Sequence, residues 1–159
     1  MPACPSCGGT IARTDSTCSY CGSDNPAYRP VSADIDAMMA GAMGALQTGN
    51  YTAAGKLYRQ IIQDDPEIYC AYFYLGHCLS QLRQYEEAIA VMQQAITLRP
   101  GSSALYYNVG VLSQSAGRSR EARASLEQAL KLADTDPVFA TPADREEFRQ
   151  RVRGALRSA

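Results

Sequence analysis

A spacing of 34 residues recurs along most of this chain and constrains its fold more than any other feature. Pro66, Pro100 and Asp134 stand at this interval. A unit of that length holds one pair of helices, which is too small to bury its apolar side alone, so stable folding needs at least three stacked units. The sequence therefore predicts a helical solenoid with one continuous core. Two further series keep the same interval: Ala54, Ala88 and Ala122, and Tyr58, Met92 and Leu126.

The residues inside each unit resemble the tetratricopeptide repeat (TPR) family, whose pattern of aromatic, small and apolar positions ends in proline. The resemblance implies a mostly α fold, an α-solenoid of three TPR helix pairs at 33–66, 67–100 and 101–134. The middle repeat fits best, and the first is the most degraded. The matching positions are Tyr72, Leu75, Gly76, Leu79, Ala88, Met92, Ala95 and Pro100 in the second repeat, and Tyr106, Val109, Gly110, Ser113, Ala122, Leu126 and Ala129 in the third.

Small residues recur where the two helices of a repeat are expected to face each other, for example at Gly76 and Gly110. Because these residues carry little or no side chain, we expect the helices to approach closely there. Larger side chains are expected to fill the space between repeats. These larger residues are Tyr72, Leu79 and Met92.

Two glycines, Gly41 and Gly44, lie inside the predicted helix 33–48. Each costs the helix about 0.8–1 kcal/mol relative to alanine, so we expect a compensating close contact along this stripe of small residues. The N-terminal segment described below is the nearest candidate, and we hypothesise that it packs on the first repeat as a cap.

The segment 135–159 is interpreted as a linker followed by a helix that caps the solenoid. Thr141 is a good N-cap residue, and Pro142 suits the first helical position. Apolar residues then recur at helical spacing, beside five arginines on the polar face. Three helix pairs and this cap make seven predicted helices. The apolar positions are Phe148, Val152, Ala155 and Leu156.

Four of the six cysteines form two C-x2-C pairs near the N-terminus. Each pair is followed by a glycine, Gly8 or Gly22, which can take the positive φ of a tight turn. Zinc takes four tetrahedral ligands, and a two-residue gap lets both thiolates of a turn reach one ion about 2.3 Å away. We therefore expect one structural zinc ion. The alternatives are two disulfides or a redox dithiol, and a catalytic metal or iron–sulfur cluster. The candidate ligands are Cys4, Cys7, Cys18 and Cys21.

These two pairs resemble the knuckles of the short prokaryotic zinc-ribbon family. The resemblance implies a small N-terminal β zinc ribbon at 1–24, with each knuckle on a β-hairpin and all four thiolates as ligands. Residues 25–32 contain two prolines and no apolar periodicity, which is typical of a linker. The other two cysteines, Cys70 and Cys78, lie in an apolar helical stretch. We interpret them as small core residues, with a functional thiol as the alternative.

In tetratricopeptide families the first helices of successive repeats line a concave groove. The equivalent positions of this sequence are largely apolar. They lack the lysines and arginine with which the family members that bind chaperones hold the C-terminal carboxylate of a peptide. The resemblance implies a hydrophobic helix or peptide as the partner. The alternatives are a groove filled by the C-terminal helix or by a second copy of the chain, and a groove with no defined ligand. The groove positions are Met39, Met43, Leu46, Cys70, Phe73, His77, Gln81, Tyr107, Val111 and Gln114.

Composition narrows the function further. The 15 basic and 16 acidic residues give a net charge of −1, which argues against a protein whose main task is to hold a nucleic-acid backbone. His77 is the only histidine, and no nucleophile–base set, phosphate loop or open metal site is recognisable, so we expect no enzyme. The leading interpretation is a protein-interaction scaffold. The alternative is a nucleic-acid-associated regulator that uses the ribbon or the arginine-rich helix.

The expected location is the cytoplasm. The N-terminal residues carry no secretory signal, and the longest apolar run near the start is about half of the roughly 20 residues that a membrane-spanning helix needs. We therefore expect no membrane insertion. In the cytosol, paired cysteines more often bind metal than form disulfides.

Overall fold

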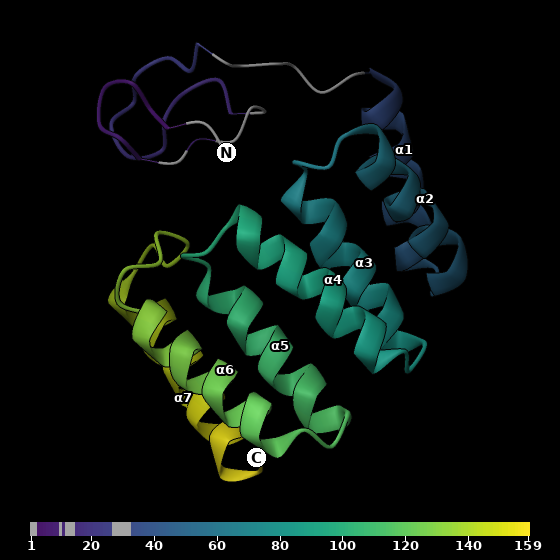
Figure 1. Ribbon diagram of the computed structural model, residues 1–159, viewed down its shortest axis with the longest axis vertical. Helices are drawn as coiled ribbons and strands as arrows, with labels where there is room; N and C mark the ends of the chain where they lie inside the picture. The colour runs from purple at the N-terminus through teal and green to yellow at the C-terminus, as the bar shows by residue number, and fades with distance from the viewer. Residues whose placement is uncertain (1–2, 10, 12–14, 27–32) are drawn as a thin grey trace.

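A computed structural model describes residues 3–9, 11, 15–26 and 33–159. Within this part the chain forms seven α-helices, and each helix packs mainly against the next one along the chain (Figure 1). The predicted helix pairs and the terminal helix are thereby confirmed. None of the described helices is both long and apolar enough to cross a membrane. The helices are α1 (Ala33–Gln47), α2 (Tyr51–Asp64), α3 (Tyr69–Gln81), α4 (Tyr85–Leu98), α5 (Ser103–Ser115), α6 (Ser119–Leu132) and α7 (Pro142–Arg157).

The turn inside each helix pair repeats one backbone geometry. Gly49 and Gly117 each take a φ of 75°, and Arg83 at the equivalent place takes a φ of 59°. In all three turns the next residue donates its N–H to a carbonyl near the end of the preceding helix, for example from Gln84 to Leu79 O at 2.9 Å. Bonds of this kind close a helix C-terminus and need one residue with positive φ. Glycine adopts that backbone without strain, whereas arginine does not.

At two helix N-termini the side chain of the N-cap residue itself accepts a backbone hydrogen bond. At α2, the Asn50 side chain accepts a hydrogen bond from the Ala53 N–H at 3.2 Å. At α7, Thr141 Oγ1 accepts from the Asp144 N–H at 3.1 Å, and the Asp144 carboxylate accepts from the Thr141 N–H at 3.1 Å. This reciprocal pair is a capping box, so the predicted start of the terminal helix is confirmed.

Glycines bring the two helices of a repeat together, as expected. A Cβ atom on Gly76 would lie 2.7 Å from Met92 Cε, and a Cβ atom on Gly110 would lie 2.6 Å from Leu126 Cγ. The absence of a side chain is therefore what leaves room for the second helix. Met92 reaches into the interface inside its own repeat, where its side chain lies against Gly76.

Aromatic stacking joins the first repeat to the second. The rings of Tyr58 of α2 and Tyr74 of α3 stack with 5.6 Å between their centroids, and Phe73 meets Tyr74 edge-on at 5.3 Å. Tyr58 is fully buried, and this burial raises its pKa to about 12. The phenol therefore stays neutral at physiological pH, and no charge is placed in the core between these repeats.

The loop between α6 and α7 is tied to the third repeat. Asp136 is buried and accepts hydrogen bonds from the Ser103 N–H at 2.7 Å and from Ser103 Oγ at 2.6 Å, so it caps the N-terminus of α5. Phe148 of α7 packs against Tyr107 of α5 and Phe139 of the loop, with centroid distances of 5.8 and 4.9 Å. The terminal helix thus covers the end of the repeat core, as repeat proteins require.

The N-terminal segment has a small core of its own, formed by Cys4, Ile11 and Cys18. Thr17 and Asp24 form an antiparallel bridge in this segment, and no strand is assigned within its described residues. The described backbone hydrogen bonds of this segment close mainly around the two cysteine pairs. The expected β-hairpins fall partly on residues 10 and 12–14, which lie outside the described residues.

The structure does not support the expected packing of this segment along the first repeat. A Cβ atom on Gly41 would lie 3.6 Å from Leu57 of α2, and no described atom comes within 4 Å of the same point on Gly44. The small-residue face of α1 is therefore partly covered by its own partner helix and is otherwise open. The predicted linker falls mostly at 27–32, which lies outside the described residues.

We expect Gly110→Ala to lower the free energy of unfolding by about 1–2 kcal/mol, although alanine improves helix propensity by about 1 kcal/mol. The added methyl would meet the Leu126 branch point and, at 3.3 Å, the Ala122 carbonyl oxygen. Gly44→Ala has open space and should stabilise the protein by up to about 1 kcal/mol. Urea unfolding followed by circular dichroism measures both. A Gly110→Ala protein as stable as the wild type would contradict the close approach of α5 and α6.

Arg83→Gly should raise the free energy of unfolding by about 0.5–1 kcal/mol, because the strain of a positive φ is removed and exceeds the entropy that glycine adds to the unfolded chain. Arg83 is exposed, so little packing is lost. Gly117→Ala, at the equivalent turn, should destabilise instead. The same urea unfolding experiment compares the two, and a loss of stability in Arg83→Gly would sink this explanation of the turn.

Candidate functional site

Two turns with matching hydrogen bonds present the four cysteines that were predicted to bind metal. In the first turn, the Gly8 N–H donates to Cys4 O at 2.8 Å and the Cys4 N–H donates to Gly9 O at 2.7 Å. The second turn repeats both bonds around Cys18, each at 2.8 Å. Gly8 and Gly22 take φ of 74° and 71°, as their place after each pair predicted. The positive φ turns the chain so that each pair of thiols points to one side.

The four sulfur atoms gather at one point. Cys4 Sγ lies 3.6 Å from Cys21 Sγ, and Cys7 Sγ lies 3.7 Å from Cys18 Sγ. All four lie within 4.8 Å of one another. A tetrahedral ion with Zn–S bonds of about 2.3 Å would hold its sulfur ligands about 3.8 Å apart. The six cysteines, all within the described residues, form no disulfide. The cluster can therefore hold a metal ion.

Ser23 is a further member of this cluster that the cysteine spacing did not reveal. Its hydroxyl oxygen lies 3.3 Å from Cys4 Sγ and 3.0 Å from Cys21 Sγ. A hydrogen bond from Ser23 lowers the pKa of Cys4 to about 6 and also lowers the pKa of Cys21. Thiolate is the form of cysteine that binds metals. The sequence offered one signal for Ser23, which is its position. It lies two residues after the second cysteine pair, as Gly9 lies two residues after the first.

The ten residues predicted to face the concave groove all lie on the first helix of a pair, α1, α3 or α5. His77 and Gln81 are exposed, and the other eight are half-buried. A half-buried apolar side chain packs on the core with one side and meets solvent with the other. Such side chains, repeated along successive helices, form a surface that suits contact with a protein partner.

The terminal helix α7 contacts two of these ten residues. Gln114 Nε2 donates a hydrogen bond to Ala155 O at 2.7 Å, and the ring of Tyr107 meets Phe148 edge-on. Both side chains therefore help to seat α7 on α5. This contact corresponds to the predicted alternative in which the C-terminal helix fills part of the groove.

Cys70 and Cys78 have the environment of core residues. Cys78 is buried and Cys70 is half-buried, and burial raises the pKa of both thiols. They are therefore protonated at neutral pH and lack the thiolate that nucleophilic chemistry uses. His77 is exposed and meets the ring of Tyr51 edge-on, with 6.4 Å between centroids. Burial thus supports the interpretation of both cysteines as core residues.

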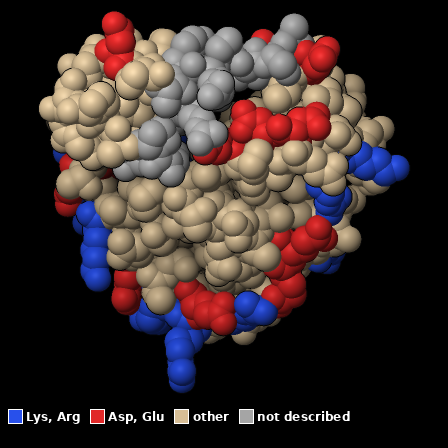
Figure 2. Space-filling model, turned by 45° about the horizontal axis from the view of Figure 1, so that its top comes forward, with Lys and Arg blue, Asp and Glu red and all other residues tan. Residues whose placement is uncertain are grey.

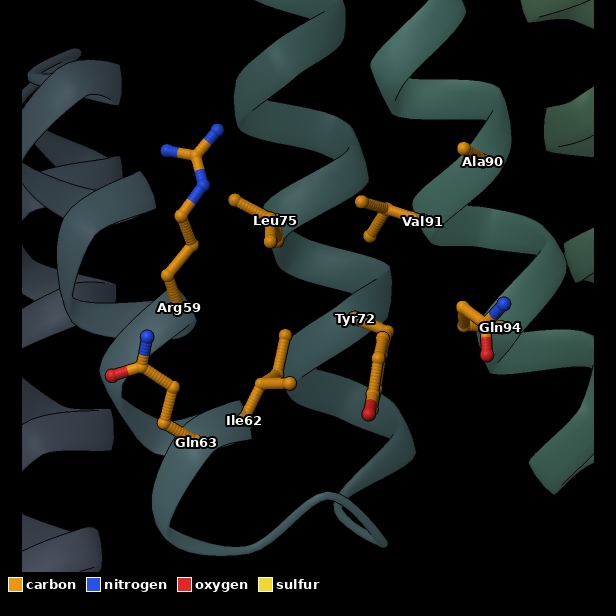
Figure 3. Close-up of a pocket in the computed structure, with 8 residues that line it drawn as sticks. All are labelled: Arg59, Ile62, Gln63, Tyr72, Leu75, Ala90, Val91 and Gln94. Atoms are coloured by element: carbon orange, nitrogen blue, oxygen red, sulfur yellow. The ribbon is translucent and has the colours of Figure 1, made fainter.

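A cavity of about 340 Å³ lies where the sequence predicted no site. Its walls are α2 and α4, the second helices of the first two repeats, and its floor is α3 (Figure 3). The side chains of Ile62, Leu75 and Val91 gather inside it, and Arg59 extends along one wall. The available sequence signal was the apolar character of Ile62 and Val91, which lie outside the repeat pattern.

On the face that Figure 2 shows, the basic side chains do not form one continuous patch. Figure 2 shows them apart from one another around the edge of one face, whose middle carries a broad area without charged side chains. On α7, three of the five arginines pair with acidic groups, which leaves fewer donors for phosphate oxygens. This arrangement does not favour a nucleic-acid interface on α7. The pairs are Arg149 with Asp134, Arg151 with Glu147 at 3.1 Å and Arg153 with Glu146 at 3.1 Å.

Comparison with solved structures identifies similar folds. The Yersinia enterocolitica type III secretion translocator chaperone SycD superposes with a TM-score of 0.71 at 21% identity, over 80% of this chain and 92% of that chain. SycD in complex with a peptide of the translocator YopD gives a TM-score of 0.71 at 20% identity, over 80% and 93%. Pseudomonas aeruginosa PcrH in complex with the chaperone-binding region of PopD gives 0.70 at 21% identity, over 82% and 94%. At this level of identity the likeness shows a shared fold.

Comparison of sequences agrees with the helix pairs. No curated protein sequence gives a significant match. The tetratricopeptide repeat family matches residues 39–103 and, in a second and overlapping match, residues 81–141. These matches span α1 to the loop before α7, including both glycine contacts described above. Residues 39–141 of this chain therefore belong to the tetratricopeptide repeat family.

Proposed function

We propose that this protein is a non-enzymatic adaptor that binds an apolar peptide or helix of a partner protein on the first helices of its repeats. The row of half-buried apolar side chains on α1, α3 and α5 carries the proposal. The similar folds support it, because SycD has been crystallised with a peptide of YopD and PcrH with a region of PopD. Peptide binding is thus an established use of this helical arrangement in those proteins.

The side chains of this surface suit a hydrophobic partner. Met39 and Met43 on α1 are unbranched and polarisable, so they can adapt their shape to a ligand. Phe73, on the first helix of the next repeat, adds a half-buried aromatic ring. Because the predicted positions contain no lysine or arginine, selection would depend on shape and apolar contact and not on a charged peptide terminus.

We infer that one zinc ion holds the N-terminal segment together, with Cys4, Cys7, Cys18 and Cys21 as its four ligands. The described core of this segment is only three residues, which is far too small to offset the entropy lost on folding. Metal binding would supply that free energy, about 10–16 kcal/mol in zinc-finger peptides at neutral pH. Four thiolates fill the tetrahedral shell, so the ion would be structural.

The purified protein should contain one zinc ion per chain. Cys7→Ser combined with Cys21→Ser should abolish this content, because it removes one exposed ligand from each turn. The helical circular dichroism should persist, since the repeats have a separate core. Elemental analysis and circular dichroism measure both outcomes. Cys70→Ser is the matched control and should keep its zinc. Full zinc content in the double variant would contradict the assignment.

Phe73→Glu combined with Val111→Glu should reduce recovery of the partner from an extract of the native organism by at least about tenfold, because burying a carboxylate against apolar groups costs several kcal/mol. Both residues are half-buried on first helices. Tyr107 is left intact because it seats α7. Affinity capture followed by mass spectrometry measures the recovery.

The control for this experiment is Ala124→Glu, an exposed change on the second helix of the third repeat. It should capture the same partner as the wild type. Urea unfolding of the double variant shows whether the repeats remain folded. The proposal fails if a folded double variant keeps the partner, or if the control loses it.

A further inference from the structure

We propose that the cavity between α2 and α4 is a second protein-binding site, whose ligand is a peptide segment with apolar side chains and a neighbouring carboxylate. The walls of this site are the second helices of the first two repeats, and its floor is α3. None of the ten predicted groove positions lines it. The two sites can therefore be tested separately.

The interior of the cavity provides an apolar contact. Leu75 is buried in its floor, while Ile62 and Val91 are half-buried on opposite walls (Figure 3). The site is an open depression of about 340 Å³, so side chains of a ligand can enter it from solvent. Apolar side chains of a ligand would be removed from water here, which is the main driving force of such contacts.

The rim of the cavity offers the groups that a peptide backbone needs. Gln63 on α2 and Gln94 on α4 are exposed on opposite walls. Each amide carries both donors and acceptors, which match the N–H and C=O groups of an extended chain. A purely apolar small molecule would leave both amides unused. The rim therefore favours a peptide as the occupant.

Charge at one end of the cavity selects an acidic ligand. A second cavity, of about 370 Å³, adjoins the first along α2 and shares Arg59 with it. Lys56 lines this second cavity, and among the described residues neither cavity is lined by an acidic side chain. Two cations at the end of an apolar surface are complementary to a carboxylate, and arginine can bind both of its oxygens.

Glu87 positions the arginine without using all of its donors. Arg59 Nη2 donates to Glu87 Oε1 at 2.6 Å. A guanidinium has five N–H donors, so several remain for a ligand. The two side chains are 44% and 47% exposed, and such exposed pairs are weak, so Glu87 would compete only slightly with a ligand carboxylate.

Selection of a phage-displayed random peptide library on the zinc-loaded full chain tests the proposal. We expect the enriched peptides to combine apolar residues with aspartate or glutamate. Ala90→Glu should lose them, because Ala90 is exposed on the α4 wall and the change adds bulk and a repelling charge. Ala124→Glu is the matched control, since Ala124 holds the equivalent place on α6 and should bind as the wild type does.

Fluorescence anisotropy with one enriched peptide then measures the charged contacts. Arg59→Gln should weaken binding by about tenfold or more, the effect of a lost charge-assisted hydrogen bond. Glu87→Gln should tighten it by about two- to fivefold, because a competitor is removed. Phe73→Glu with Val111→Glu should leave the affinity unchanged, which separates this site from the surface proposed for the adaptor function.

Several outcomes would overturn the proposal. These are no enrichment on the wild type, enriched peptides without acidic residues, and equal binding by Ala90→Glu. Self-association of the wild type that Ala90→Glu abolishes, measured by sedimentation, would assign the cavity to a second copy of the chain instead. If Ala90→Glu proves less stable in urea, Gln94→Glu on the exposed rim replaces it and should show the same loss of binding.

Discussion

The close approach of the two helices within a repeat is the constraint on which the rest of the structure depends. At Gly76 and Gly110 the opposing side chains of Met92 and Leu126 occupy the volume that a Cβ atom would need. This contact sets how closely the two helices approach in the second and third repeats, and the pairs then stack through neighbouring helices. The orientation of first and second helices, and hence both of the surfaces discussed above, follows from it.

The two surfaces differ in kind because they arise at different interfaces. The predicted groove positions belong to helices whose outer sides are apolar and half-buried, including Met39 and Phe73. The cavity arises where α2 and α4 flank α3 without filling the space above it. Its edges carry Arg59 and amides, whereas the groove positions carry no lysine or arginine. A chain of this size can thus offer one surface that selects by shape and another that also selects by charge.

Much of the fold was predictable because it is periodic. The interval of 34 residues identified all three helix pairs, and Thr141 with Pro142 located the start of α7. The spacing of the four cysteines likewise predicted a cluster that the structure brings together. In each case the prediction rests on residue types at fixed separations. Such separations determine which side chains share one face of a helix or one side of a turn.

Other features were not predictable because they depend on where side chains end in space. Periodicity marked Met92 as buried but did not show that its tip lies on Gly76 of the same repeat. Periodicity predicted a turn near Arg83. It did not show that this residue takes a positive φ, which is strained for arginine. The cavity between α2 and α4 and the Ser23 contacts with sulfur involve residues outside any motif. The expected close contact at Gly41 is not seen, since a Cβ atom there would lie at an ordinary contact distance of 3.6 Å from Leu57 of α2.

Packing between consecutive helices also determines how such a chain acquires its structure. Most contacts join residues within about one repeat of each other, so little loop-closure entropy is lost as each forms, and topologies of this kind fold in microseconds to milliseconds. Folding can begin at any helix pair and spread to its neighbours. The bond between Gln114 and Ala155 spans 41 residues. It requires a folded α5, so the terminal helix docks only after the third repeat has formed, wherever folding begins.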